Sequence, residues 1–364
     1  MDFARRSLPG IDLASRAANA CLSMTSPASE EGKRRAAASH ATAPNQTALT
    51  SDQLRGFLRA EVMRTPRVVR EWLGAERLER HLTTWITRHL VAHGHRSEAY
   101  VISTPRGAAL ACRAESQKHG AKPLVEVIAL AFLPNDRAEL GELARAALDG
   151  VPGDHDDKVR LIWWHDAPWQ PDRVEPGHAA DAAGPTIKIG KSLFSMPIER
   201  IVELPPPAGR ERVRMSLATD LDFYDEYARH YQAWMEASPH LADFVRVETR
   251  EDMQAFLDEG LLALAEFDGA HGWELGGVMA ARGGKSMLGL GGVQTAEEFI
   301  YPAFRGQGLA APMQRAYVDL LATQGYGVDG GCVIGWIHHI NEASRRTALK
   351  VGRHELARQV LVRP

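Results

Sequence analysis

The chain has few cysteines, no cluster of basic residues and no long apolar run. Its 364 residues include three cysteines, Cys21, Cys112 and Cys332, whose wide spacing fits neither a metal site nor a disulfide framework. The formal net charge is −3 and Lys and Arg do not gather locally, which argues against a nucleic-acid surface. No apolar stretch is long enough to span a membrane. We therefore expect no metal, no nucleic-acid partner, no membrane partner and a cytoplasmic location with reduced thiols.

What the chain does contain is enough apolar sequence for substantial cores. Hydrophobic residues make up 45% of it, and its length predicts two domains. Residues 1–51 differ, because they are rich in Ala, Ser, Thr and Arg with little periodicity, and we predict a disordered tail there. Residues 1–23 partly match the composition of a transit peptide, and whether Met24 is the true start stays open.

The order of the expected elements occurs twice. In each half, helical periodicity is followed by three strand-like runs, a further helix and a further strand. In residues 52–185 we expect helices at 53–64, 66–74 and 76–92, strands at 99–103, 108–113 and 124–132, a helix at 137–148 and a strand at 159–164. In residues 213–364 we expect a strand at 213–217, helices at 221–236 and 250–259, strands at 261–267, 274–282 and 287–300, a helix at 313–323, a strand at 332–338, a helix after 341 and a strand at 355–362. The sequence predicts an α/β (α+β) protein, with a mixed, mostly antiparallel sheet flanked by helices in two tandem units.

The region between the two units is less regular. Residues 166–184 are rich in Pro, Asp, Ala and Gly and are typical of a linker or long loop. Residues 186–212 are interpreted as a linker or edge segment. Within them, Ile198–Leu204 stops at three prolines and is expected to form an edge strand that completes one of the sheets.

A glycine-rich turn joins a strand to a helix near the C-terminus, in the sequence FIYPAFRGQGLA from Phe299 to Ala310. The first backbone N–H groups of a helix lack intrahelical acceptors and attract anions. Gly306 and Gly308 have no Cβ, so a pyrophosphate can approach the backbone, and Arg305 adds a positive charge. The turn therefore predicts a phosphate cradle.

The turn allows two other interpretations. Gly306–Ala311 also fits the dinucleotide fingerprint, with Asp329 near the expected acidic position. Only 53 residues follow Ala311, however, which is too few for the βα units of that fold. A glycine-rich turn that binds no ligand remains open as the other alternative.

The turn resembles the R-x-x-G-x-G/A acetyl-CoA-binding motif of the GNAT (Gcn5-related) N-acyltransferase superfamily. A second pattern of that family, Asn341, Ser344, Lys350 and Gly352, begins 35 residues after Gly306. The resemblance covers the C-terminal half and implies an acyl-CoA N-acyltransferase fold there. It also implies that acetyl-CoA, as the acyl donor, is bound by Phe299, Ile300, Arg305, Gly306, Gln307, Gly308, Leu309, Ala310, Asn341 and Ser344.

The family's chemistry is direct attack of an amine on the thioester, here expected to acetylate a small molecule or an amino-acid-like metabolite. A backbone N–H, for which Ile300 is the candidate, would polarise the carbonyl. Glu297 and Glu298 are candidate bases, and as neighbours on a strand they must face opposite sides. His338 and His339 are candidate proton relays.

Two departures from the family pattern leave the activity open. Many members place a Tyr, which can protonate the leaving thiolate, where this chain has Ala348. Either Ser344, Thr347 or water replaces the Tyr, or the thiolate leaves unassisted. Arg353 stands where the pattern has Phe. The alternatives are therefore a non-catalytic acyl-CoA-binding or regulatory module, or an acyltransferase that uses a larger acyl-CoA or a carrier-protein thioester. Whether the chain forms a homodimer is also open.

The N-terminal half is interpreted as a degenerate GNAT-like unit. When Pro134 is matched with Pro302, Arg137 matches Arg305, but the residues that replace the glycine turn are unsuited to a phosphate. They are Ala138, Glu139, Leu140 and Glu142. Two carboxylates and a leucine Cβ would repel and block a pyrophosphate. This half is expected to be a scaffold or a wall of the substrate site.

Overall fold

The computed structural model describes residues 51–90, 99–114, 122–164, 167, 184–240, 245–288, 290–328 and 330–364. The predicted tail lies outside these residues except for Ser51, and so does most of the predicted loop at 166–184. All the described residues belong to one compact unit.

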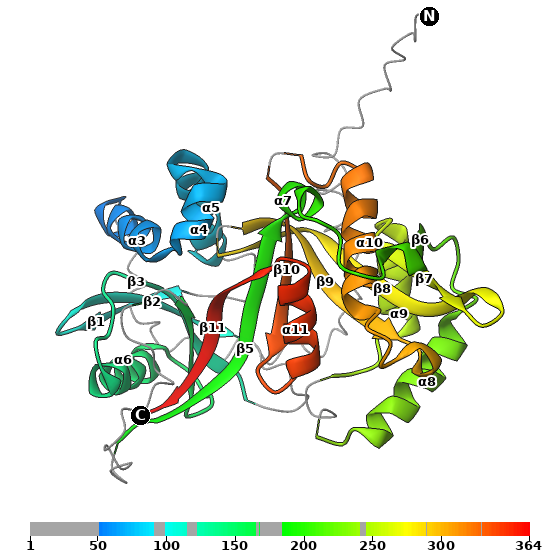
Figure 1. Cartoon of the computed structure of the whole chain (residues 1–364). Helices are drawn as coiled ribbons and strands as arrows, with labels where there is room; N and C mark the ends of the chain where they lie inside the picture. The colour runs from blue at the N-terminus through cyan, green and yellow to red at the C-terminus, as the bar shows by residue number, and fades with distance from the viewer. Residues whose placement is uncertain are drawn as a thin grey trace, which may run out of the picture. The chain divides into compact units, whose positions relative to one another are not determined.

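The described strands form one 11-stranded sheet in the order β1-β2-β3-β4-β11-β5-β10-β9-β8-β7-β6 (Figure 1). Only the pairs β3–β4 and β9–β10 in this sheet are parallel, so the predicted mixed, mostly antiparallel sheet is confirmed. The strands are β1 (Ala99–Thr104), β2 (Gly107–Ala114), β3 (Leu124–Leu130), β4 (Val159–Trp164), β5 (Thr186–Pro197), β6 (Val213–Leu217), β7 (Leu262–Gly269), β8 (Gly272–Met287), β9 (Leu290–Ile300), β10 (Cys332–His338) and β11 (His354–Arg363).

Helices cover both faces of the sheet. In the N-terminal half, the core of α3–α5 includes Leu110 and Cys112 of β2, whereas the core of α6 includes the alternate residues Ala109 and Ala111. Alternate strand residues point to opposite faces, so α3–α5 and α6 lie on opposite sides. The helices are α3 (Ser51–Arg64), α4 (Arg67–Leu73), α5 (Ala75–Leu90), α6 (Arg137–Gly150), α7 (Ile198–Glu203), α8 (Tyr224–Ala237), α9 (Arg250–Asp258), α10 (Ala310–Thr323) and α11 (Glu342–Lys350), with short 3₁₀ turns at Arg210–Arg212 and Pro302–Phe304.

The two halves of the chain exchange strands at the centre of the sheet. β5 follows β4 in the sequence, yet it pairs with β10 and β11. The last strand, β11, returns to lie between β4 and β5. The C-terminal strands β6–β10 are thus completed by β5, and the N-terminal strands β1–β4 by β11.

This exchange corrects the prediction for residues 186–212. The expected edge strand at Ile198–Leu204 is wrong, because Ile198–Glu203 form α7 and the strand in this segment is the central β5. Ile198 and Ile201 are fully buried while Glu199 and Arg200 are exposed. That spacing of three is helical, whereas a strand would bury alternate residues.

The topology of the two halves repeats. β3 carries a bulge at Ile128 and β9 one at Ala296, where each pairs with its antiparallel neighbour. The offset between the bulges is 296 − 128 = 168, the same as between Pro134 and Pro302 (302 − 134 = 168). In each half a helix then connects the bulged strand to its parallel partner. The structure therefore supports the tandem arrangement, while the domain boundaries stay predictions.

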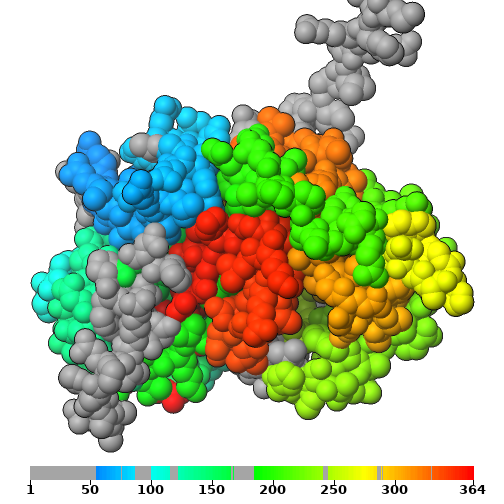
Figure 2. All heavy atoms as spheres, in the orientation of Figure 1, coloured from blue at the N-terminus to red at the C-terminus, as the bar shows by residue number. Residues whose placement is uncertain are grey.

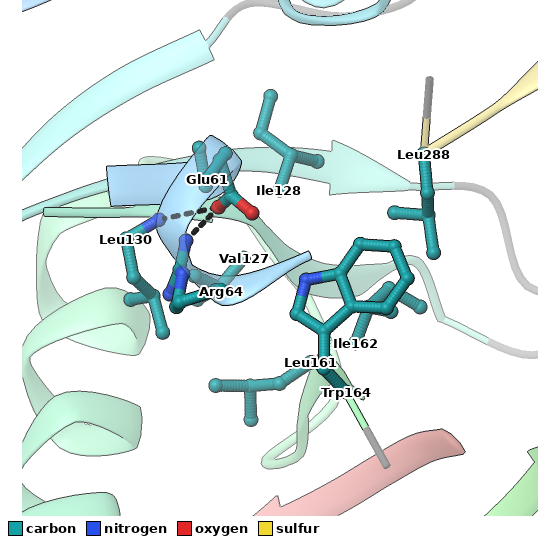
Figure 3. A pocket seen from close by; sticks show the side chains of 10 residues that line it. Glu61, Arg64, Val127, Ile128, Leu130, Leu161, Ile162, Trp164 and Leu288 are labelled. Atoms are coloured by element: carbon teal, nitrogen blue, oxygen red, sulfur yellow. Dashed lines mark hydrogen bonds and ion pairs between the residues drawn. The ribbon is translucent and has the colours of Figure 1, made fainter. Parts of the chain in front are cut away.

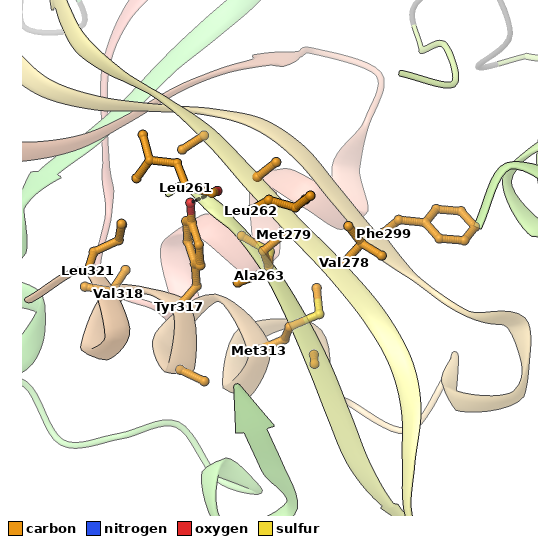
Figure 4. Close-up of a cluster of buried hydrophobic side chains, with 14 of the residues drawn as sticks. Leu261, Leu262, Ala263, Val278, Met279, Phe299, Met313, Tyr317, Val318 and Leu321 are labelled. Atoms are coloured by element: carbon orange, nitrogen blue, oxygen red, sulfur yellow. Dashed lines mark hydrogen bonds between the residues drawn. The ribbon is translucent and has the colours of Figure 1, made fainter. Parts of the chain in front are cut away.

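Helix α10 is fixed firmly to the C-terminal half of the sheet. Met313 and Tyr317 are almost fully buried against β7 and β8, with Leu321 beside them (Figure 4). The Tyr317 hydroxyl donates a hydrogen bond of 2.7 Å to the carbonyl oxygen of Leu261. Burial of three large side chains contributes several kcal/mol, at about 1.5–3 kcal/mol each. The first turn of α10 is consequently held at a defined position beside β9.

Candidate functional site

The parallel strands β9 and β10 separate after a short ladder. They pair at three positions, the last of which joins Ile334 to Gln294. Beyond that point β9 continues to Ile300 and β10 to His338 without pairing to each other. The bulge at Ala296 lies at the start of this divergence, and bulges bend a strand. We call the region between residues 295–300 and 335–338 the strand opening.

Two backbone N–H groups of β9 point into the strand opening. The Tyr301 N–H donates to the Gly276 carbonyl at 2.8 Å, so by antiparallel alternation Ile300 and Glu298 turn their amide groups away from β8. The Glu298 N–H donates to the Glu297 carboxylate at 2.8 Å. Within the described part of the chain, no group accepts the Ile300 N–H. That amide is therefore free to polarise a carbonyl group, as the sequence suggests.

The predicted phosphate cradle lies at the start of α10. Gly306 and Gly308 are exposed, with φ of 77° and 76°, and an added Cβ at either position would meet nothing within 4 Å. Leu309 is the N-cap residue, and no side chain hydrogen-bonds to the cap. No side chain therefore caps this helix start, and the space beside the two glycines is open, which suits anion binding at a helix start.

The strand opening and the cradle lie at one edge of the sheet. Because β9 and β10 are parallel, their carboxyl ends meet there, and each is followed by a helix, α10 or α11. α11 packs beside α10 on the face seen in Figure 2. At its start, Asn341 accepts a hydrogen bond of 3.2 Å from the Ser344 N–H. Asn341 is thus a helix cap whose amide NH₂ remains available, and Ser344 lies half-buried in the first turn.

The Arg305 side chain packs against aromatic residues beside the cradle. Its guanidinium stacks over Trp234 and Phe299, with centroid distances of 4.8 and 4.7 Å, and its Nε donates to the Ile300 carbonyl at 2.7 Å. Burial lowers its pKa. These contacts hold the side chain against β9 and α8, and its role in phosphate binding stays a prediction.

Arg212 supplies a cation that the sequence did not reveal. It precedes β6, and its Nη2 donates to Gln307 Oε1 at 3.0 Å. Gln307 in turn donates to the Ala303 carbonyl at 3.0 Å. Arg212 is therefore the basic side chain that contacts the cradle, although it lies 95 residues from Gln307 in the sequence.

The two candidate bases face opposite sides of β9, as predicted. Glu297 accepts a hydrogen bond of 2.8 Å from the Tyr227 hydroxyl of α8, and Glu298 accepts one of 2.5 Å from Gln314 of α10. Burial raises the pKa of Glu297 to about 8, against the lowering effect of the Tyr227 bond. Burial likewise raises the pKa of Glu298 to about 7, countered by Gln314 and the charge of Arg353. Both carboxyls thus titrate near neutrality, which suits a general base.

The histidine pair lies at the end of β10. The His339 ring Nδ1 is 2.9 Å from the Gly190 carbonyl of β5, and the two imidazole centroids are 4.6 Å apart. Burial, His339 and Lys191 together lower the pKa of His338 to about 4. His338 is therefore neutral at physiological pH and a weak base, which favours the glutamates for proton transfer.

In the equivalent opening of the N-terminal half, side chains of α3 line a small pocket (Figure 3). β3 and β4 pair at three positions and then diverge. Between them, Glu61 of α3 accepts the Leu130 N–H at 3.2 Å and forms an ion pair with Arg64. By the offset of 168, Leu130 corresponds to Glu298, whose N–H also points into an opening. The Glu61–Arg64 pair thus places a carboxylate and a guanidinium of α3 in the opening between β3 and β4.

The helix start in the N-terminal half is also closed. Asp136 caps α6 by accepting the Glu139 N–H at 2.9 Å, and Glu139 accepts the Asn135 N–H at 2.8 Å. Leu140, which matches Gly308 in the sequence, is fully buried against the sheet. The start of α6 thus has side-chain acceptors that the start of α10 lacks, in keeping with a degenerate unit.

No group of three or more His, Cys, Asp or Glu side chains in the described residues is placed to hold a metal ion. No described helix is long and apolar enough to cross a membrane. No protein-family model matches the chain, and no curated protein matches it in sequence.

Several solved structures are similar to this chain. A GCN5-related N-acetyltransferase from Sphaerobacter thermophilus is 16% identical, with 88% of this chain and 96% of that one covered and a TM-score of 0.47. A tandem GNAT protein from the clavulanic acid biosynthesis pathway is 15% identical, with coverages of 86% and 95% and a TM-score of 0.42. A GCN5-related N-acetyltransferase from Kribbella flavida is 14% identical, with coverages of 78% and 95% and a TM-score of 0.41. At such low identity and structural overlap, these likenesses assign no activity to this chain.

Proposed function

We propose that this protein is an acyl-CoA-dependent N-acyltransferase that transfers an acyl group, with acetyl as the reference case, to the amine of a small molecule. The observation that carries the proposal is the position of the strand opening beside the uncapped start of α10. The opening offers the unpaired Ile300 N–H to a thioester carbonyl, and the helix start offers backbone N–H groups to a pyrophosphate. An acyl-CoA has both parts in that order.

Different residues of the C-terminal half would bind the donor, polarise its carbonyl and accept the proton. The free Ile300 N–H would polarise the thioester carbonyl, and the cradle from Gly306 to Ala310 would bind the phosphates. As the amine attacks, the new N–C bond forms, the C–S bond breaks and the electron pair goes to sulfur. The proton that the nitrogen loses would go to Glu297, since its Oε1 already lies at the opening, on the Glu298 N–H.

The leaving thiolate would receive little help. Ala348 has no hydroxyl, and the buried Thr347 hydroxyl donates to the Ala343 carbonyl at 2.9 Å. The half-buried Ser344 hydroxyl is the remaining candidate from the sequence. We propose that the thiolate departs without a strong acid, which a thiol of ordinary pKa permits.

The test is calorimetric titration of the full chain with acetyl-CoA, followed by free-thiol release with a panel of amines. Gly308→Glu should remove binding, because a carboxylate would then project into the cradle. Gly325→Glu is the matched control, because Gly325 is an exposed glycine at the other end of α10 with φ of 83° and open space around its Cβ position. Loss of binding in both variants, or in neither, would overturn the cradle assignment.

The identity of the base is tested separately by the pH dependence of the rate. If Glu297 is the base, the rate should rise through a midpoint near pH 8, and Glu297→Gln should remove this limb. A midpoint near pH 7 that survives in Glu297→Gln and disappears in Glu298→Gln would identify Glu298 instead.

A second candidate function is a non-catalytic acyl-CoA-binding or regulatory module. Ala348 and the bonded Thr347 hydroxyl favour it, because neither can protonate the thiolate. Tight acetyl-CoA binding would support this function if no amine releases a thiol from any CoA thioester or carrier-protein thioester. A cytoplasmic location, a homodimer and the absence of nucleic-acid or membrane partners stay predictions.

A further inference from the structure

Glu297, the base of the proposed reaction, is held by a tyrosine of α8. The Tyr227 hydroxyl donates to Glu297 Oε2 at 2.8 Å, and the Glu298 N–H donates to Glu297 Oε1 at 2.8 Å. Glu297 is 5% exposed and Tyr227 is fully buried. Each carboxylate oxygen thus has its own donor, one from α8 and one from β9 at the strand opening.

The Tyr227 ring is fixed by other aromatic rings. It packs edge-on against Phe299 of β9 at a centroid distance of 5.6 Å and against Tyr231 of α8 at 5.7 Å. The Tyr224 ring is 6.0 Å away. Phe299 lies two residues after Glu297 on the same strand, so both side chains face α8. This packing sets the place of the Tyr227 hydroxyl relative to the Glu297 carboxylate.

The hydroxyl can direct its proton only toward the carboxylate. The backbone N–H of Glu248, in the segment before α9, donates to the Tyr227 oxygen at 3.4 Å. A backbone N–H cannot accept a hydrogen bond, so the phenolic proton is left for Glu297. Burial and the negative charge of Glu297 raise the pKa of Tyr227. The hydroxyl therefore stays protonated and donates whenever Glu297 is ionised.

The Tyr227 hydrogen bond opposes the other groups around Glu297. Burial and the charges of Glu248 and Glu298 raise the pKa of Glu297, whereas the Tyr227 hydroxyl and the Glu298 N–H lower it. Tyr231 also faces this carboxylate, because burial and the charge of Glu297 raise the pKa of Tyr231. No Lys or Arg of the described residues forms an ion pair with Glu297. Tyr227 is thus the side chain that stabilises the ionised form of Glu297.

We infer that Tyr227 is a positioning residue of the acyl transfer, because its hydroxyl turns Glu297 Oε1 toward the strand opening and stabilises the carboxylate. This inference rests on the proposed function and adds a residue that acts through Glu297 rather than on the substrate. With Oε2 held by Tyr227, the proton that the amine loses forms its new O–H bond at Oε1. The electrons of the broken N–H bond stay on the nitrogen.

The test is the pH dependence of thiol release by the wild type, Tyr227→Phe and Tyr231→Phe, with the fastest amine of the panel. Tyr227→Phe keeps the ring and loses the hydroxyl, so the midpoint near pH 8 should rise by about one to two pH units. The rate at pH 7 should then fall about 10- to 100-fold, because the ionised fraction of Glu297 falls by that factor. Acetyl-CoA affinity should stay within about 2-fold, because the cradle is unchanged.

Tyr231→Phe is the matched control, at a second buried tyrosine of α8. The Tyr231 ring stacks on Phe299 at 4.7 Å, and its hydroxyl forms no hydrogen bond with the described part of the chain. The control should keep the midpoint near pH 8. If Tyr227→Phe lowers the rate equally at every pH and leaves the midpoint unmoved, the inference is wrong and Tyr227 only packs in the core.

A second variant serves if Tyr227→Phe does not fold. A ring-fluorinated tyrosine at position 227 keeps the hydroxyl and makes it a stronger donor, so the midpoint should fall below that of the wild type. An unchanged or raised midpoint would overturn the inference. A wild-type midpoint that survives in Glu297→Gln would also overturn it and leave acyl transfer standing, whereas no thiol release by the wild type from any acyl-CoA would overturn both.

Discussion

The Glu61–Arg64 pair in the N-terminal half should be essential to the stability of the fold. The side chains are 7% and 8% exposed, and Glu61 also accepts the buried Leu130 N–H. Replacing Glu61 with Leu leaves a buried guanidinium without its carboxylate, at a cost of about 3–5 kcal/mol. The unpartnered Leu130 N–H alone accounts for about 1–3 kcal/mol of such a loss. We expect a total of about 4 kcal/mol, against an unfolding free energy of roughly 5–15 kcal/mol for a typical domain.

The matched variant removes both charges. In Glu61→Leu/Arg64→Met the buried guanidinium is gone, so only the Leu130 N–H lacks a partner, and the loss should fall to about 1–3 kcal/mol. Urea unfolding followed by circular dichroism on the wild type, both single variants and the double variant gives the coupling between the two side chains. A Glu61→Leu loss below about 1 kcal/mol would refute the reasoning, because exposed ion pairs are worth that little.

Three further outcomes are expected. Glu297 has a folded-state pKa of about 8, above its unfolded value, so its contribution to stability is complete at low pH and is lost as pH rises through 8. The unfolding free energy of Glu297→Gln should therefore match that of the wild type near pH 4.5 and exceed it above pH 8. Parallel curves of unfolding free energy against pH for the two proteins would contradict this. Gly292→Ala should lower the unfolding free energy by about 3 kcal/mol or more, because φ is 146° and a Cβ would collide with the Cys332 backbone. Gly306→Ala, whose Cβ meets only open space, should lower it by about 1–2 kcal/mol. Equal losses of unfolding free energy in urea would count against the described start of the β9–β10 ladder. Asp136→Ala removes the side-chain cap of α6 and should lower stability by about 1 kcal/mol, which thermal unfolding can measure, and an unchanged melting temperature would argue against the cap.

Much of the fold could be predicted because its signals are local. The strands at 159–164, 213–217 and 332–338 have the predicted bounds, since their apolar runs are delimited by turn residues. The cradle is recognisable for the same reason, because Gly306 and Gly308 adopt positive φ immediately before a helix. Local signals of this kind need no knowledge of what packs against them.

The parts that were missed depend on distant contacts. The central position of β5 follows from its pairing with β10 and β11, which are far away in the sequence. The motif that contains Arg305 gives no sign that its guanidinium stacks on Trp234 of α8. No pattern in the sequence pairs Glu61 with Leu130 or places Arg353 beside Gly335. The only available signal for the last was that Arg353 replaces an expected Phe.

The measurement that tests the central claim most directly is the affinity of acetyl-CoA for the wild type, Gly308→Glu and Gly325→Glu, each checked for folding by circular dichroism. We predict that the wild type and Gly325→Glu bind alike and that Gly308→Glu loses binding by at least about 100-fold, since a carboxylate there repels the pyrophosphate and fills the cradle. Folded Gly308→Glu protein with unchanged affinity would contradict the account and leave the segment from Gly306 to Ala310 as an ordinary glycine-rich turn.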